Sequence, residues 1–143
     1  STRFDYTVIG DAVNLGSRLE GLNKEYGTNI IVPKYTYLAA QEEFAFRELD
    51  IVKVKGKDLP IKIYELMGDK KAVVELKEFI DLFETGLKAY RAKAWAMAEE
   101  YFGHVLELRP EDGPSKVYLS RIKVLRDAEL PDYWDGVFVM KTK

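Results

Sequence analysis

The sequence contains no cysteine and only one histidine among its 143 residues. The absence of cysteine excludes disulfide bonds, a thiolate-bound zinc cluster and a thiol nucleophile within this chain. It is consistent with a reducing compartment, so we expect a cytoplasmic location, with membrane anchoring by upstream segments left open. The histidine, His104, falls on the polar side of a predicted helix, and we interpret it as a solvent-exposed residue.

The sequence also lacks a strong excess of either charge and lacks long apolar runs. It has 24 acidic and 22 basic residues, which give a formal net charge of −2 at pH 7. A nucleic-acid partner is therefore not expected. No apolar run approaches the roughly 20 residues that a membrane-spanning helix needs, and the N-terminus lacks a basic-then-apolar signal pattern. We expect no membrane contact by this segment.

Hydrophobic residues make up 47% of the sequence and aromatic residues 13%, which is enough to form a packed core. A chain of this length can form one medium-sized domain or two small ones. The composition changes near Gly68, so we predict an α+β segment over residues 1–68 and an all-helical segment over residues 69–143. Because the stretch STRFDYTVIG reads as a strand from its start, we expect further residues before Ser1 in the intact protein.

The α+β segment begins with the stretch YTVIGDAVNLGSRLEG, in which an apolar run gives way to a helical pattern. Asp11 is a good N-cap residue, because its carboxylate can accept from free N–H groups of the first turn. Apolar residues then recur on one face of a helix that ends at Gly27, namely Leu15, Leu19, Leu22 and Tyr26. Asn14 and Arg18 lie one turn apart beside this apolar stripe, and they can be either solvated residues or donors directed at an anion.

The rest of the α+β segment reads as one strand, one short helix and a hairpin. Residues 28–32, TNIIV, predict a buried strand, and residues 34–41 predict a short helix that begins after Pro33. The alternation of apolar and polar residues over 44–68 predicts two antiparallel strands joined by the turn KGKD at residues 55–58.

The second segment has helical periodicity throughout. Its three apolar stripes are Leu76, Phe79, Ile80, Phe83, Leu87 and Tyr90; then Ala98, Tyr101, Phe102, Val105 and Leu108; then Val117, Tyr118, Ile122 and Leu125. Pro110 ends the second predicted helix, and Pro114 occupies a favourable first position of the third. The ending YWDGVFVM places Trp134 and Phe138 where a solvated tail is normally polar, so we expect this tail to be docked.

One pair of helices in this segment follows a repeat pattern. The spacing of Phe83, Leu87, Tyr90, Ala98, Phe102 and Pro110 matches the tetratricopeptide pattern, with one residue fewer in its middle. A single repeat cannot bury its apolar stripe alone. We therefore expect it to pack on the first segment, on the third helix or on another chain, and a protein partner for this tail stays open.

Two separated motifs, YTVIGDAVNLGSRLEG and VKVKGKDLPIKIYEL, occur in the order typical of one family. Over roughly residues 4–67, the chain resembles the C-terminal part of the catalytic domain of class III adenylate and guanylate cyclases. The helical segment, with its closing YWDGV, resembles the tetratricopeptide-like tail of some bacterial members. The resemblance implies an α+β fold that is part of the ferredoxin-like cyclase domain, followed by an all-α tail.

The resemblance also assigns roles to four residues. Arg18 matches the arginine that contacts the α-phosphoryl oxygens, and Asn14 matches the asparagine that orients the ribose. Thr7 falls where the family reads the base, and Lys55 matches a lysine on the terminal phosphates. Alternatives from the residues alone stay open: Arg18 can pair with an acid such as Glu25, Thr7 is a common strand residue, and Lys55 can be solvated surface like Lys57.

The implied reaction forms 3′,5′-cyclic AMP from ATP and releases pyrophosphate, with adenine preferred over guanine by resemblance only. Members of the family use two metal ions, Mg²⁺ or Mn²⁺, held by two aspartates in the first half of the domain. That half is absent from this sequence, so we expect the isolated chain to be inactive. Active sites of this class lie at a homodimer interface. The alternative is a non-catalytic dimerisation or protein-interaction module of a signalling protein.

Overall fold

The computed structural model describes residues 19–53 and 59–140, and in these ranges four strands form one sheet. The strands are β1 (Ile31–Pro33), β2 (Phe44–Lys53), β3 (Ile61–Asp69) and β4 (Phe138–Val139), in the order β1-β3-β2-β4. β3 pairs antiparallel with both β1 and β2, whereas β4 pairs parallel with β2. The predicted hairpin is thus confirmed, while its turn at residues 55–58 lies outside the described residues.

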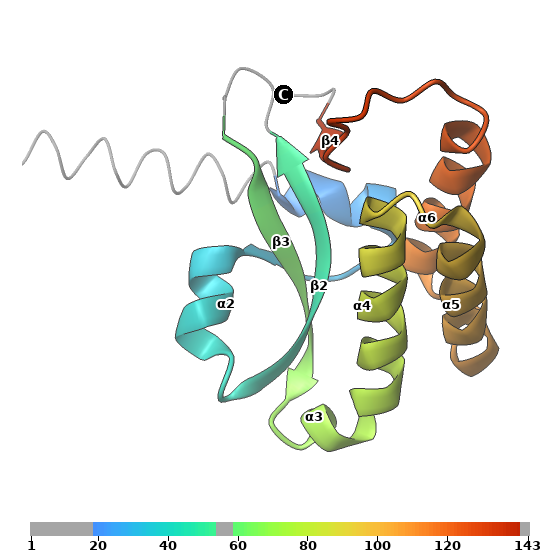
Figure 1. The fold of residues 1–143 in the computed structure, drawn as a ribbon. Helices are drawn as coiled ribbons and strands as arrows, with labels where there is room; N and C mark the ends of the chain where they lie inside the picture. The colour runs from blue at the N-terminus through green and yellow to red at the C-terminus, as the bar shows by residue number, and fades with distance from the viewer. Residues whose placement is uncertain (1–18, 54–58, 141–143) are drawn as a thin grey trace, which may run out of the picture.

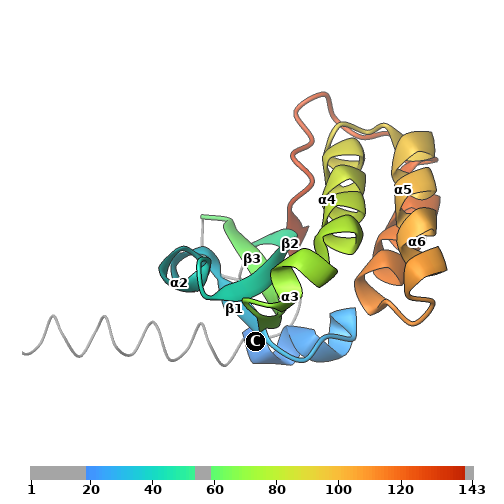
Figure 2. The ribbon, with the colours of Figure 1, turned by 90° about the horizontal axis from the view of Figure 1, so that it is seen from below.

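Six helices accompany the sheet in the described chain. The first runs over residues 19–26 in the described part, and the others are α2 (Lys34–Ala40), α3 (Ala72–Glu75), α4 (Lys77–Arg91), α5 (Trp95–Leu108) and α6 (Gly113–Leu125). Figures 1 and 2 show α2 on one side of the β2–β3 hairpin and α4, with α5 and α6 beyond it, on the other side. The predicted α+β composition is therefore confirmed. In the described part, no helix has the length and apolar character needed to cross a membrane.

A register irregularity in β2 decides which of its residues enter the core. Glu48 pairs with Tyr64 and Asp50 pairs with Ile63, so Leu49 is an extra residue between two neighbouring pairs. Such a bulge breaks the strict alternation of a strand. As a result, the consecutive residues Leu49 and Asp50 are both buried, at 0% and 1% exposure.

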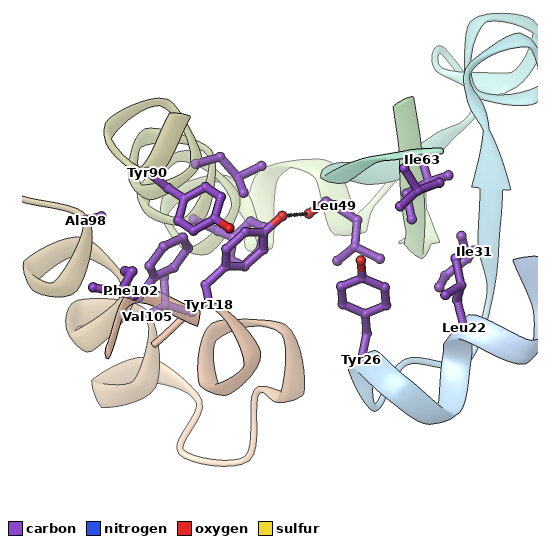
Figure 3. Packing of buried hydrophobic residues seen from close by; sticks show 14 of the residues in the cluster. Leu22, Tyr26, Ile31, Leu49, Ile63, Tyr90, Ala98, Phe102, Val105 and Tyr118 are labelled. Carbon is purple, nitrogen blue, oxygen red and sulfur yellow. Dashed lines mark hydrogen bonds between the residues drawn. The ribbon is translucent and has the colours of Figure 1, made fainter. Parts of the chain in front are cut away.

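One hydrophobic core extends from the helix 19–26 through the sheet to the helices α4, α5 and α6 (Figure 3). Leu22 and Tyr26 lie beside Ile31 and Leu49 at one end, and Phe102 and Tyr118 lie at the other (Figure 3). The Tyr118 hydroxyl donates to the carbonyl oxygen of Leu49 at 2.8 Å and joins the two ends. Of the three packing partners left open for the repeat, the structure shows two, because α4 packs on β2 of the first segment and α5 packs on the third helix, α6. Residues of both segments contribute to this core. The division of the chain into two domains at residue 68 stays a prediction.

The C-terminal tail is docked, as predicted. Trp134 packs edge-on against Tyr90 and Trp95, with ring centroids 5.5 and 5.6 Å apart. Farther along, the Met140 N–H donates to the carbonyl oxygen of Lys53 at 2.9 Å, and the Met140 side chain is buried. Aromatic packing and strand pairing therefore hold the tail at two separate places.

Two local predictions differ from the structure. The first strand covers Ile31–Pro33 instead of residues 28–32, because Gly27 (φ 73°) and the Thr28–Asn23 hydrogen bond form a turn first. β1 tolerates Pro33 because β1 is an edge strand, in which the N–H groups on the outer side have no neighbouring strand to bond to. Leu108 is 48% exposed, although the stripe placed it inward, because it is the last residue of α5.

Trp134→Ala tests the docking of the tail. We expect it to lower the free energy of unfolding of the chain by about 2–3 kcal/mol, because it empties a partly buried aromatic site. Tyr133→Ala is the matched control, since Tyr133 is 86% exposed, and it should change stability by less than about 0.5 kcal/mol. Equal effects of the two substitutions, measured by urea titration, would contradict the docked arrangement.

Candidate functional site

The four residues with predicted site roles, Thr7, Asn14, Arg18 and Lys55, lie outside the described residues. Their roles therefore stay predictions. The structure does describe the elements that adjoin two of them in the chain. The described part of the first helix, residues 19–26, adjoins Arg18 in the sequence, and β2 ends at Lys53, two residues before Lys55.

The helix 19–26 is held in place by one apolar face. Leu19, Leu22 and Tyr26 are 1%, 3% and 0% exposed, and they recur at helical spacing. On the opposite side, Glu20 and Lys24 are exposed. Three buried anchors within eight residues fix both the position and the rotation of this helix on the sheet.

The end of this helix lies directly against the start of α6. Gly27 has a φ of 73°, and its backbone N–H donates to the Asn23 carbonyl oxygen at 2.8 Å. A Cβ atom on Gly113 would lie 2.1 Å from the carbonyl oxygen of Tyr26. Only glycine permits this contact, because a Cβ atom at that distance collides with backbone. The helical segment therefore abuts the helix 19–26, whose described part adjoins Arg18 in the sequence.

A polar cluster of Tyr26, Asp50 and Arg121 lies beside this contact. The Tyr26 hydroxyl donates to Asp50 Oδ2 at 2.5 Å, and Arg121 Nη1 donates to the same oxygen at 2.8 Å. Arg121 Nη2 also donates to the Tyr26 hydroxyl at 3.2 Å. Burial and the Asp50 charge raise the pKa of Tyr26, so the phenol stays protonated and keeps donating at neutral pH.

A second buried cluster surrounds Arg47, which is 1% exposed. Arg47 Nε donates to Glu65 at 2.8 Å, and its two terminal nitrogens donate to the Asp112 carboxylate at 3.1 and 2.7 Å. Asp112 also accepts from the Ser115 N–H and hydroxyl, so it caps α6. Burial raises the pKa of Glu65, and the charge of Arg47 opposes that rise.

The described residues do not form a metal site. In the ranges 19–53 and 59–140, no three or more His, Cys, Asp or Glu side chains are grouped so that they could hold an ion. His104 is 46% exposed on α5, with Glu100 and Glu107 at 4.0 and 3.8 Å, in agreement with the prediction of a solvent-facing residue.

Surface hollows in the described chain carry no catalytic assignment. One of about 400 Å³ lies between α2, β2 and α4, and the aromatic residues Tyr37, Phe44 and Phe46 contribute to its lining. Another of about 490 Å³ follows the outer side of α4, with Lys77 and Asp81 in its wall. Lys77 and Asp81 pair with each other at 3.0 Å on the surface. Their charges thus already have partners.

Comparison with known proteins identifies adenylate cyclases as relatives. The terminal-differentiation-specific adenylate cyclase of Dictyostelium discoideum is 35% identical over 135 residues, which are 90% of this chain and 6% of that protein. An adenylate cyclase of Anabaena cylindrica is 52% identical over 69 residues, which are 46% of this chain and 14% of that protein. The chain is a homologue of adenylate cyclases. The resemblance predicted from the two motifs is thereby confirmed.

A third relative, adenylate cyclase 1 of Rhizobium meliloti (strain 1021), is 41% identical over 71 residues, or 50% of this chain and 11% of that protein. The chain thus spans only a small part of the length of each of these relatives. The match to the Dictyostelium protein covers so much of the chain that it includes both the α+β and the helical segment. No protein-family model matches the chain, and no solved structure matches it either. The tetratricopeptide-like character of the tail stays a prediction.

Sequence reasoning missed the buried polar residues Arg47, Asp50 and Arg121. A signal existed for Arg47, because strand alternation places it on the same face as Ala45 and Leu49, which are apolar. A charged residue at an inward position indicates a buried partner. Asp50 carried no such signal, since the bulge at Leu49 shifts it onto the buried face.

Gly113→Ala tests the contact between the helix 19–26 and α6. We expect it to lower the free energy of unfolding by about 2 kcal/mol or more, because the added methyl group collides with the Tyr26 carbonyl oxygen. Gly103→Ala is the control, since a Cβ atom at Gly103 meets nothing within 4 Å and alanine favours the helix by about 0.5–1 kcal/mol. The assigned contact is wrong if urea titration shows both variants to be stabilised.

Proposed function

We propose that this chain is the nucleotide-contacting part of an adenylate cyclase that forms 3′,5′-cyclic AMP from ATP and releases pyrophosphate. The observation that carries the proposal is the identity of 35% to the Dictyostelium adenylate cyclase over 90% of the chain. The fold is proposed to be the C-terminal part of the ferredoxin-like cyclase domain. The four-stranded sheet and the helix 19–26, which buries one apolar face, support this proposal.

In this proposal, the chain acts by positioning and by charge neutralisation. The ribose 3′-oxygen attacks the α-phosphorus, and pyrophosphate leaves, so negative charge accumulates on phosphate oxygens. Arg18 neutralises charge at the α-phosphoryl group, and Lys55 binds the terminal phosphates. Asn14 orients the ribose, and Thr7 contacts the base through its hydroxyl group. The buried anchors Leu19, Leu22 and Tyr26 hold the described helix 19–26, which adjoins Arg18 in the sequence.

Metal ions in this proposal are bound elsewhere. Two ions, Mg²⁺ or Mn²⁺, stabilise the attacking and leaving oxygens in two-metal phosphoryl chemistry. The described residues offer no cluster for them. We propose that the ligands come from another segment of the intact protein, that this chain alone is inactive, and that two copies of the protein form the active homodimer.

Arg18→Ala in the intact protein tests the proposed reaction. We expect kcat to fall by about 10²-fold or more with little change in KM, because the contact strengthens as charge develops in the transition state. Lys24→Ala is the matched control, since Lys24 is an exposed cation on the helix 19–26. Steady-state rates of cyclic AMP formation from ATP, with Mg²⁺ or Mn²⁺ supplied, provide the measurement.

Lys55→Ala should show the opposite pattern, because the terminal phosphates are bound in the ground state too. We expect KM to rise more than kcat falls, and Lys57→Ala should change neither by more than about twofold. Wild-type kinetics in both Arg18→Ala and Lys55→Ala would show that the site assignment is wrong. An intact protein that forms no cyclic AMP would favour the dimerisation or protein-interaction module.

A further inference from the structure

The polar cluster of Tyr26, Asp50 and Arg121 joins three elements at one buried point. Tyr26 belongs to the helix 19–26, Asp50 to β2, and Arg121 to α6. Each side chain contacts the other two, at 2.5, 2.8 and 3.2 Å. The remaining Asp50 oxygen accepts from the Ile51 N–H at 2.7 Å. A closed set of three contacts permits little relative movement of the three elements.

Arg121 is itself fixed by the C-terminal tail. Its guanidinium carbon lies 4.3 Å from the ring centre of Phe138, 5.0 Å from that of Tyr118 and 5.6 Å from that of Tyr26. Phe138 stands opposite Val52 in the parallel pairing of β4 with β2. The tail therefore contacts the end of β2 before Lys55 directly, and it is linked to the helix 19–26 through Arg121.

We infer that Arg121 is a positioning residue, through which α6 and the tail fix the helix 19–26 relative to the end of β2, the two described elements that adjoin Arg18 and Lys55 in the sequence. The inference rests on the proposed function, because the placement of these two elements affects the rate only if Arg18 and Lys55 contact one nucleotide. It gives the helical segment a part in the reaction without any contact between that segment and the substrate.

Energetic reasoning favours positioning over simple stabilisation. Asp50 and Arg121 have side chains that are 1% and 14% exposed, so both lose hydration in the fold. The cost of removing such charges from water offsets much of their attraction, and apolar residues of similar volume often stabilise a fold as well or better. A buried pair does impose one geometry. A displacement of about 1 Å at a catalytic group can lower a rate on the order of 10²-fold.

The kinetic test uses the intact protein with Arg121→Met, which keeps an unbranched apolar stem and removes the donors. We expect kcat to fall at least about tenfold with KM changed less than about threefold. Arg121→Lys should recover part of the rate, because an ammonium can still pair with Asp50. Lys123→Met is the control, since Lys123 is exposed on the same helix and should leave both constants unchanged. Tyr26→Phe, which keeps the ring and removes only the hydroxyl, should lower kcat in the same direction.

A second readout does not depend on activity. Amide hydrogen exchange in Arg121→Met should accelerate at least about fivefold more in residues 19–26 than in α4, because loss of the donors frees this helix beyond any general loss of stability from the unpaired Asp50 charge. If wild-type protein forms no cyclic AMP, the proposed function fails, and the exchange comparison still decides whether Arg121 restrains this helix. Wild-type kcat and wild-type exchange in Arg121→Met overturn the inference, as does equal acceleration in α4 and residues 19–26. If Arg121→Met does not fold, Tyr26→Phe provides both measurements with the same criteria.

Discussion

The arrangement of the described chain depends on the ion pairs that the buried guanidinium of Arg47 makes with Glu65 and Asp112. The guanidinium connects β2 to Glu65 of β3 and to Asp112 at the start of α6, and it lies over the rings of Phe79 and Phe83 of α4. Burial lowers the pKa of Arg47. The hydrogen bonds with Asp112 and the charge of Glu65 raise this pKa by more than burial lowers it, so the net shift is upward. Arg47 is therefore a permanent cation in the core. Loss of the Arg47 guanidinium leaves two largely buried carboxylates without their cation, and breaking a buried ion pair in this way costs about 3–5 kcal/mol.

This requirement makes the helical segment part of the same folded unit as the sheet. Arg47 with Asp112 and Asp50 with Arg121 are two cross-links between β2 and the α6 region, and Glu48 with Arg91 adds a third to α4. The similarity to the Dictyostelium adenylate cyclase likewise extends over both segments. We therefore regard the helical segment as a scaffold for the proposed nucleotide-contacting elements.

Apolar periodicity predicted the elements well, because the core consists mainly of regular apolar stripes. The hairpin, the end of the first helix at Gly27 and the docking of Trp134 all followed from such patterns. The polar cross-links did not follow from them. A charged residue on a strand is usually solvated, and its partner here lies as many as 71 positions away in the sequence. The parallel pairing of the two-residue strand β4 also depends on tertiary packing, since so short a segment has no period of its own.

The candidate site was predicted by family resemblance, and the comparisons confirm the resemblance while leaving each residue role a prediction. Thr7, Asn14, Arg18 and Lys55 come from two motifs that periodicity alone would assign to a strand, a helix and a turn. The amino-acid composition carried no information about these four residues. Four polar residues do not noticeably change the composition of a chain with nearly equal numbers of acidic and basic residues. Their supports, such as Asp50 and Arg121, became recognisable only when the fold placed them beside the helix 19–26.

Amide hydrogen exchange of the chain at increasing urea concentrations tests most directly whether the two segments form one unit. If the buried cross-links unite them, the opening free energies of the helix 19–26, β2, α4 and α6 should converge on one common value as urea rises, because these elements unfold together. A lower-energy opening of α4, α5 and α6, with the helix 19–26 and β2 still protected, would contradict this account.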